Sequence, residues 1–175
     1  MRALLFVSLI TLGFSMSAMA DATKPAFPSI QSQNLNGDNM RLPEDFQGEV
    51  NLVIFAFKRN QQAVVDTWLP SAADLAKRFQ QFDYYELPAV GPQPGFMKSI
   101  IDNGMRSGIQ DTGTRGRTIT LYVPKAPLMA ALDMKSDRTI YLMLLDRQNR
   151  VIWRSEGPAT KTGLNDLAAA VAGAI

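Results

Sequence analysis

One uninterrupted apolar run constrains this chain most: residues 51–57 read Asn-Leu-Val-Ile-Phe-Ala-Phe, without alternation of apolar and polar positions. Such a strand is buried on both faces, as in the centre of a parallel or mixed sheet covered by helices. A polar turn at residues 58–62 follows, and then a helical spacing of apolar residues. The sequence therefore predicts an α/β fold in which a central strand opens onto a helix start, where free backbone N–H groups gather.

The composition excludes several kinds of chemistry. The chain contains no cysteine and no histidine, so it lacks thiolate nucleophiles, imidazole acid–base groups and the commonest transition-metal ligands. Its aspartates do not follow the spacing of a calcium loop, and we expect neither a metal nor a cofactor. The net charge is +2, with both signs scattered along the chain and no basic stripe interleaved with aromatic residues, which argues against nucleic-acid binding.

The first twenty residues have the pattern of an export signal. Met1 and Arg2 form a short positive start, residues 3–14 are mostly apolar, and Ala18-Met19-Ala20 is a small-x-small cleavage site. We expect cleavage after Ala20 and a periplasmic or secreted mature protein, with an uncleaved anchor as the alternative. No later stretch is apolar enough to span a bilayer, so no membrane span is expected after cleavage.

Turn and periodicity signals divide the remainder into an N-terminal extension, residues 21–41, and one domain, residues 42–175. Pro70 is expected to break the first long helix, and four glycines within residues 104–116 favour a mobile loop. The expected elements are a hairpin turning at 36–38, strand 51–57, helix 62–81 broken near 68–71, strand 82–87, helix 96–105, strand 117–123, helix 127–133, the hairpin strands 139–145 and 150–154, and helix 163–175 capped by Thr160 or Thr162.

This order of elements is the layout of the thioredoxin fold, a central mixed sheet flanked by helices. Residues 46–55 resemble the lead into the first core strand of thioredoxin-like and peroxiredoxin-like proteins, and residues 141–151 resemble their terminal hairpin. More narrowly, residues 51–68 and the Arg-Val-Ile-Trp-Arg sequence at 150–154, with Gly157 and Ala159, resemble the mitochondrial ATP-synthase assembly factor family, which is thioredoxin-like. Ile152 departs from that family, which has arginine before the tryptophan.

The resemblance implies that this chain lacks redox activity. It places Asn60-Gln61-Gln62-Ala63 where a redox enzyme of this fold carries Cys-x-x-Cys. The cis-proline that faces that motif should fall at residues 138–140, where the sequence has no proline. Disulfide exchange requires a thiolate that attacks sulfur, and no side chain here replaces it.

In thioredoxin-like folds, the loop after the first core strand, the loop before the terminal hairpin and the start of the first long helix meet on one side. The resemblance therefore predicts a binding face for a protein or peptide partner, and a role as an assembly factor or chaperone-like subunit. Two alternatives stay open: a non-thiol enzyme, and a small-molecule carrier with residues 104–116 as a lid. The residues assigned to the binding face are Lys58, Arg59, Asn60, Gln61, Trp68, Glu86 and Arg138.

A purely structural interpretation of the same residues also stays open. The turn at residues 58–62 is then a solvated loop capped by Asn60, Trp68 is part of the core because it falls at helical spacing, and Glu86 is an ordinary surface acid.

Overall fold

A computed structural model describes residues 26–175 of this chain. The predicted signal peptide, residues 1–20, and the start of the predicted extension lie outside the described residues.

The centre of the fold is a four-stranded mixed sheet with the order β4-β3-β5-β6. The two middle strands are buried: every residue of β5 and all but the last of β3. β3 is parallel to β4 and antiparallel to β5, and β5 forms an antiparallel hairpin with β6. The predicted central strand and terminal hairpin are confirmed. The strands are β3 (Val50–Ala56), β4 (Phe82–Pro88), β5 (Tyr141–Leu145) and β6 (Val151–Glu156).

Both faces of this sheet are covered, as the apolar run of β3 requires. Leu52 and Ile54 point to one face, where they pack with buried residues of three helices, α1 (Gln62–Val65), α2 (Leu69–Arg78) and α6 (Lys161–Ala174). Val53 and Phe55 point to the other face, which a separate hairpin and α5 (Lys125–Ala131) cover. That hairpin consists of β1 (Ile30–Gln33) and β2 (Asn39–Leu42), and it places residues of the predicted extension in the core.

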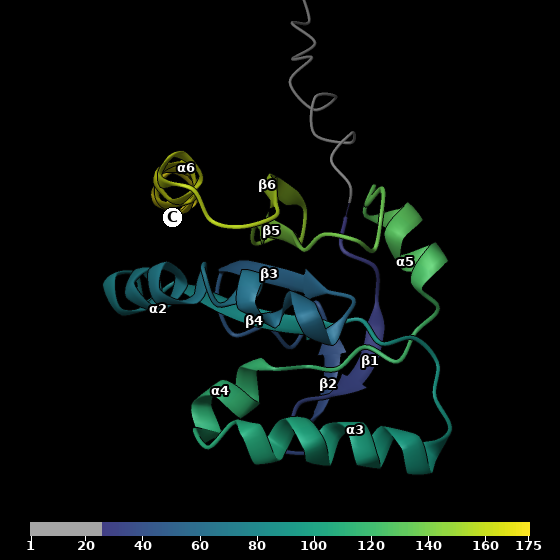
Figure 1. Cartoon of the computed structure of the whole chain (residues 1–175). Coiled ribbons are helices and arrows are strands. Elements are labelled where there is room, and N and C mark those ends of the chain that lie inside the picture. Colours follow the sequence, from purple (N-terminus) through teal and green to yellow (C-terminus); the bar gives the residue numbers. More distant parts are fainter. Residues whose placement is uncertain (1–25) are drawn as a thin grey trace, which may run out of the picture.

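The remaining helices are α3 (Gly95–Gly108) and α4 (Thr112–Arg117), with a short 3-10 turn, η1 (Arg59–Gln61), at the end of β3. Figure 1 shows α3 on the outside of the molecule, beside the β1–β2 hairpin and at the opposite end from α6. Among residues 26–175, no helix combines the length and the apolar character needed to cross a membrane.

Two sequence predictions are wrong in this region. Residues 104–116 are not a loop: α3 runs through Gly104 to Gly108, and α4 begins at Thr112 because the Asp111 side chain accepts a hydrogen bond from Thr114 N at 2.6 Å. The predicted strand 117–123 is an extended segment instead. It makes isolated parallel bridges from Thr118 to Glu86 of β4 and from Leu121 to Ala89 just after β4, and an antiparallel bridge from Ile119 to Asn34 just after β1, but it has no continuous ladder.

The long helix is interrupted where the sequence predicts, between α1 and α2. Trp68 lies in this break, next to Leu69 and Pro70 in the first turn of α2. Its side chain is 1% exposed, and its indole N–H donates to the carbonyl of Gly157 at 2.9 Å. The ring also meets Trp153 edge to face, with 6.1 Å between ring centroids. Trp68 therefore joins the helix break to the chain that leaves β6.

We expect Trp68→Ala to lower the free energy of unfolding by about 3–5 kcal/mol, because it removes a fully buried aromatic ring and leaves a cavity. Urea unfolding followed by circular dichroism measures the change. Phe96→Ala is the control, since Phe96 is 67% exposed and its loss should change stability by less than about 0.5 kcal/mol. Equal effects of the two substitutions would contradict the structural role of Trp68.

Candidate functional site

The predicted face is built where β3 ends. The strand runs into η1, and the loop before β5, residues 136–140, lies opposite. Lys58 Nζ forms an ion pair with Asp137 Oδ1 at 3.1 Å, with both side chains partly exposed. The two loops therefore meet, as the thioredoxin-like layout predicts. We call residues 58–62 together with residues 136–138 the turn face.

Gln61 holds the turn face together from inside. Its side chain is buried, and its Oε1 accepts hydrogen bonds from the backbone N–H groups of Phe57, at 2.7 Å, and Lys58, at 3.2 Å. Its Nε2 donates to the carbonyl of Asp137 at 3.0 Å. One amide thus satisfies two donors at the end of β3 and one acceptor in the facing loop. The position predicted to replace a redox motif contains a structural crosslink made of hydrogen bonds.

Lys125 completes the closure of this region. Its Nζ donates to the carbonyl of Phe57 at 3.2 Å and lies 5.9 Å from the centre of the Phe57 ring. The turn at the end of β3 is therefore tied to α5 as well as to the loop before β5. The side chains of Gln61 and Lys125 therefore form hydrogen bonds with backbone groups that lie near the active site in a thioredoxin-like layout.

Five residues of the turn face are exposed to solvent: Lys58, Arg59, Asn60, Gln62 and Arg138. Of these, Lys58 forms an ion pair with Asp137, and Gln62 donates hydrogen bonds to Asp66 and Glu86. Within residues 26–175, the side chains of Arg59 and Asn60 have no hydrogen bond or ion pair. The side chain of Arg138 makes a 3.4 Å contact from Nε to Ser136 Oγ, and its backbone N–H donates to the same oxygen at 3.1 Å. Arg59 follows Lys58 and Arg138 follows Asp137 in the sequence, so the two arginines belong to the two loops that the Lys58–Asp137 ion pair joins.

Glu86 lies beneath this face. It pairs with Ile54 in the β3–β4 ladder, is 8% exposed, and accepts a hydrogen bond from Gln62 Nε2 at 3.1 Å. Burial raises the pKa of the Glu86 carboxyl, the Gln62 hydrogen bond opposes that rise, and the nearby Asp66 carboxylate adds to it. Gln62 also donates to Asp66 Oδ1 at 2.9 Å, so one amide lies between two acids.

The structure thus separates the predicted site residues into three groups. Lys58 and Gln61 join the two loops, while Arg59, Asn60 and Arg138 face solvent. Glu86 and Trp68 lie behind the surface, and Trp68 has no area available for a partner. Sequence reasoning missed Asp137, Gln62 and Lys125. Asp137 could have been found from the expected approach of residues 58–62 to the loop containing Arg138. That approach predicts a charged partner for Lys58, but only when the thioredoxin-like fold is assumed.

The turn face presents charged and hydrogen-bonding groups. Among the described residues, no group of three or more acidic side chains has the arrangement to hold a metal ion. No proline or cis peptide bond lies in residues 136–141. The amide of Gln61 is not a nucleophile, and its hydrogen-bonding groups are engaged. What remains is a positively charged, hydrogen-bonding surface.

We expect Gln61→Ala to lower the free energy of unfolding by about 1–3 kcal/mol, because the buried N–H of Phe57, the N–H of Lys58 and the carbonyl of Asp137 lose their partner. Chemical denaturation measures the loss. Asn60→Ala is the matched control, since this neighbouring amide is exposed. A Gln61→Ala protein as stable as the control would show that water replaces the amide at no cost.

Glu86 predicts a pH dependence of stability. Its folded-state pKa lies above the ordinary value of 4.5, so its ionisation disfavours folding. This penalty is present above the folded-state pKa and disappears as pH falls from that pKa to the ordinary value. Glu86→Gln should therefore be more stable than the unsubstituted protein at neutral pH, with a difference that shrinks as pH falls toward 4.5.

Thermal and urea unfolding at several pH values measure this difference. Glu156→Gln, at an exposed acid of β6, is the control and should show no such trend. A Glu86→Gln effect that is constant with pH would rule out a burial penalty on the carboxylate.

Comparison with known proteins identifies the fold but no close relative. No protein-family model and no curated protein matches the sequence. Solved structures do match over most of the chain. A putative electron transfer protein from Aquifex aeolicus VF5 has a TM-score of 0.61 at 10% identity, over 87% of this chain and 97% of that protein.

Two further structures agree. BsSco, a member of the Sco family of cytochrome c oxidase assembly proteins, has a TM-score of 0.59 at 14% identity, over 87% of this chain and 94% of its own. The exposed lipoprotein thioredoxin of Streptococcus pneumoniae strain TIGR4 has a TM-score of 0.54 at 15% identity, over 81% and 98%. Identities this low establish the fold alone, and the chain therefore has a thioredoxin-like fold, built without cysteine.

Proposed function

We propose that this protein is an exported, redox-inactive thioredoxin-like protein that binds a polypeptide partner through its turn face. The observation that carries the proposal is the use of Gln61. Its amide holds together the two loops that border the active site in redox-active relatives of this fold, and it leaves two arginines exposed beside it. A rigid backbone that presents exposed guanidinium groups suits recognition and not thiol chemistry.

The charge of the turn face indicates the kind of partner. Lys58, Arg59 and Arg138 carry three positive charges and Asp137 one negative charge, which leaves an excess of two positive charges. Arginine binds carboxylates with two parallel hydrogen bonds, so an acidic segment or a C-terminal carboxylate of the partner fits this surface. The Lys58–Asp137 pair fixes the backbone on which both arginines stand.

Export and an assembly role belong to the same proposal. The signal-like start of the sequence supports export, and the fold likeness to an exposed lipoprotein thioredoxin is consistent with it. The resemblance of residues 51–68 and 150–159 to the mitochondrial ATP-synthase assembly factors supports a role as an assembly factor or chaperone-like subunit. The fold likeness to a member of the Sco family of assembly proteins points the same way.

The two alternatives from the sequence receive less support. The small-molecule carrier loses its proposed lid, because residues 104–116 are helical over most of their length. The non-thiol enzyme would need an accessible acid or base. Glu86 is the acid with a raised pKa near the turn face, and it is buried beneath Gln62.

We expect Arg59→Ala and Arg138→Ala each to weaken the partner complex about ten- to a hundredfold, because each removes a charge-assisted hydrogen bond worth about 1.5–3 kcal/mol. The partner is identified by crosslinking and affinity capture from an envelope extract of the native cell. Affinity for each variant is then measured with the purified partner by titration calorimetry.

Lys161→Ala, at an exposed cation of α6, is the control for a nonspecific charge effect. The melting temperature of every variant should stay close to that of the unsubstituted protein, since exposed charges contribute less than about 0.5 kcal/mol to stability. If both arginine variants bind the partner as tightly as Lys161→Ala does, the turn face is not the binding surface.

A further inference from the structure

The chain covers two of its strand edges with its own extended segment, residues 118–122. Asn34, just after β1, bridges Ile119 of this segment, which lies along the outer side of the hairpin. The same segment makes the bridges to Glu86 of β4 and to Ala89 just after it. Since the sheet has the order β4-β3-β5-β6, the edge opposite β4 belongs to β6.

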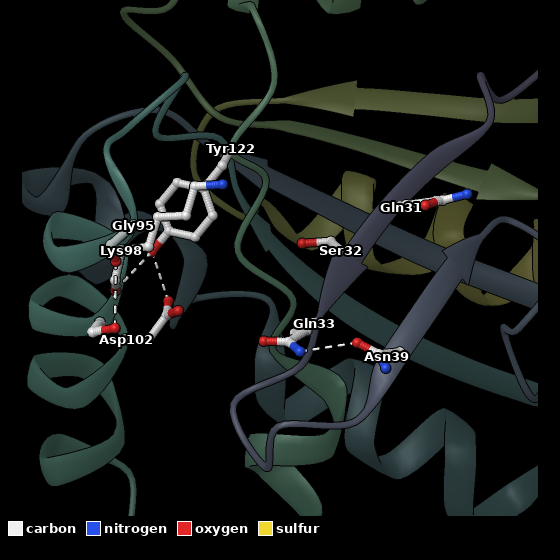
Figure 2. A pocket seen from close by; sticks show the side chains of 9 residues that line it. Gln31, Ser32, Gln33, Asn39, Gly95, Lys98, Asp102 and Tyr122 are labelled. Carbon is white, nitrogen blue, oxygen red and sulfur yellow. Dashed lines mark hydrogen bonds between the residues drawn. The ribbon is translucent and has the colours of Figure 1, made fainter.

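A polar cleft of about 430 Å³ lies between the β1–β2 hairpin and α3, and its side chains bond to one another. Figure 2 shows Gln33 bonded to Asn39 on the hairpin side, at 2.9 Å, and Tyr122 bonded to Asp102 of α3, at 2.7 Å. Lys98 Nζ lies 5.1 Å from the centre of the Tyr122 ring. The charged groups of the cleft are therefore engaged with its own tyrosine.

The outer edge of β6 carries main-chain groups that point away from the sheet. Gly157 N donates to the carbonyl of Ile140 at 3.1 Å, so these two residues form a hydrogen-bonded pair at the end of the β5–β6 ladder. In an antiparallel ladder, such pairs alternate with pairs whose N–H and C=O groups point outward. The register therefore makes Glu156 and Arg154 the outward-pointing residues in the second half of β6.

This part of the edge is open. Within residues 26–175, no hydrogen bond reaches the main-chain N–H or C=O of Arg154 or Glu156. Residues 26–27 pair with residues 149–150, which precede β6. Figure 1 shows β6 at the end of the sheet, with α6 on one side and α5 on the other. An unpaired strand edge of this kind is a template for a further strand.

The two outward-pointing residues carry opposite charges on one face of the strand. Arg154 and Glu156 are two positions apart, so their side chains lie on the same face, and both residues are exposed. Nη2 of Arg154 donates to the carbonyls of Leu132 and Asp133, which holds the guanidinium beside the end of α5. The Glu156 carboxylate has no hydrogen bond or ion pair with the described part of the chain.

We propose that two copies of this protein associate through β6, as antiparallel strands related by a two-fold axis at Ser155. Arg154 of each copy then lies opposite Glu156 of the other copy, and each of these pairs exchanges two main-chain hydrogen bonds. Side chains directly opposite in an antiparallel pair lie on the same face, so each arginine meets a glutamate. The two sheets join into one continuous sheet, and the association is isologous.

Hydrogen bonding and charge select this register over its neighbours. Outward groups must face outward groups, so the alternative registers place Arg154 against Arg154 of the second copy, or Glu156 against Glu156. Like charges directly opposite destabilise a sheet, whereas opposite charges stabilise it. The alternatives would also use Ile152, which the β5–β6 register skips at a bulge, or Pro158, which has no N–H.

The contact is small, because two residues of each copy supply all of its main-chain hydrogen bonds, and small interfaces form weak, transient complexes. We expect a dissociation constant of about 100 µM to 1 mM, so unfolding measured at a few micromolar reports on the monomer. The inference is independent of the proposed function, since β6 and the turn face share no residue. Loss of partner binding in Arg59→Ala would leave it intact.

The test measures self-association of the purified protein between about 10 µM and 2 mM, a range that brackets the expected constant. Sedimentation equilibrium should show a monomer–dimer equilibrium, and the ¹⁵N resonances of residues 153–157 should shift with concentration. In a mixture of ¹³C-labelled and unlabelled protein, a nuclear Overhauser effect between the Hα atoms of the two Ser155 residues would fix the antiparallel register, because this pair is the close, non-hydrogen-bonded one.

Charge reversal tests the pairing of Arg154 with Glu156. Glu156→Arg and Arg154→Glu each place like charges opposite one another and should weaken self-association about tenfold. An equimolar mixture of the two variants brings opposite charges together again, so its heterodimer should form about as readily as the homodimer of the unsubstituted protein. Should Arg154→Glu fail to fold without its bonds to Leu132 and Asp133, Glu156→Arg and the Ser155 contact carry the test.

Lys77→Glu and Asp74→Arg, at exposed positions of α2, are the matched controls. They change the net charge by the same amounts as the β6 variants, alone and mixed, and should leave self-association unchanged. Effects equal to those of the β6 variants would assign the association to net charge and not to the pairing of β6.

Three further results would overturn the proposal. The first is a protein that stays monomeric up to about 2 mM. The second is concentration-dependent shifts on α3, where Phe96 and Ile100 are exposed, and not at residues 153–157. The third is self-association that appears only after residues 21–25 are removed, which would make that segment of the same chain the occupant of the β6 edge.

Discussion

Burial of β3 on both faces is the constraint on which the other elements depend. With Leu52 and Ile54 on one side and Val53 and Phe55 on the other, the sheet needs an apolar layer on each face. The helices α1, α2 and α6 supply one layer. The other is assembled from the β1–β2 hairpin, the extended segment after α4, and α5. This second layer is made of short pieces, and it leaves α3 outside the core and a cleft between α3 and the hairpin.

Elements with a strong apolar pattern were predictable from the sequence, and those fixed by distant contacts were not. The central strand, the break near Pro70 and the terminal hairpin follow from local pattern and proline geometry. Residues 104–116 were misjudged because glycines indicate conformational freedom only where nothing else fixes the backbone. Here Arg106 Nε donates to the carbonyl of Leu35 at 2.7 Å, and Arg115 Nε donates to that of Ile109. The first of these contacts joins residues 71 positions apart.

The candidate site divides in the same way. The sequence and the resemblance located the turn after β3 and its approach to the loop containing Arg138. They did not distinguish exposed side chains from buried ones. Gln61 and Asn60 are adjacent amides of similar polarity, yet one is the internal crosslink of the turn face and the other is solvated, because only Gln61 points back toward the end of β3. Trp68 satisfied the spacing of a helix, and its burial depends on Gly157 and Trp153, which come from the far end of the chain.

The amide of Gln61 also determines how the turn face responds to redox conditions. In a thioredoxin-like protein with two cysteines, the loop at this position exists in an oxidised and a reduced form, and its shape and reactivity change with the electron supply of its compartment. Hydrogen bonds from a carboxamide neither gain nor lose electrons. The side-chain link between the two loops therefore has the same form in oxidising and in reducing surroundings, and so does the backbone that carries the two arginines.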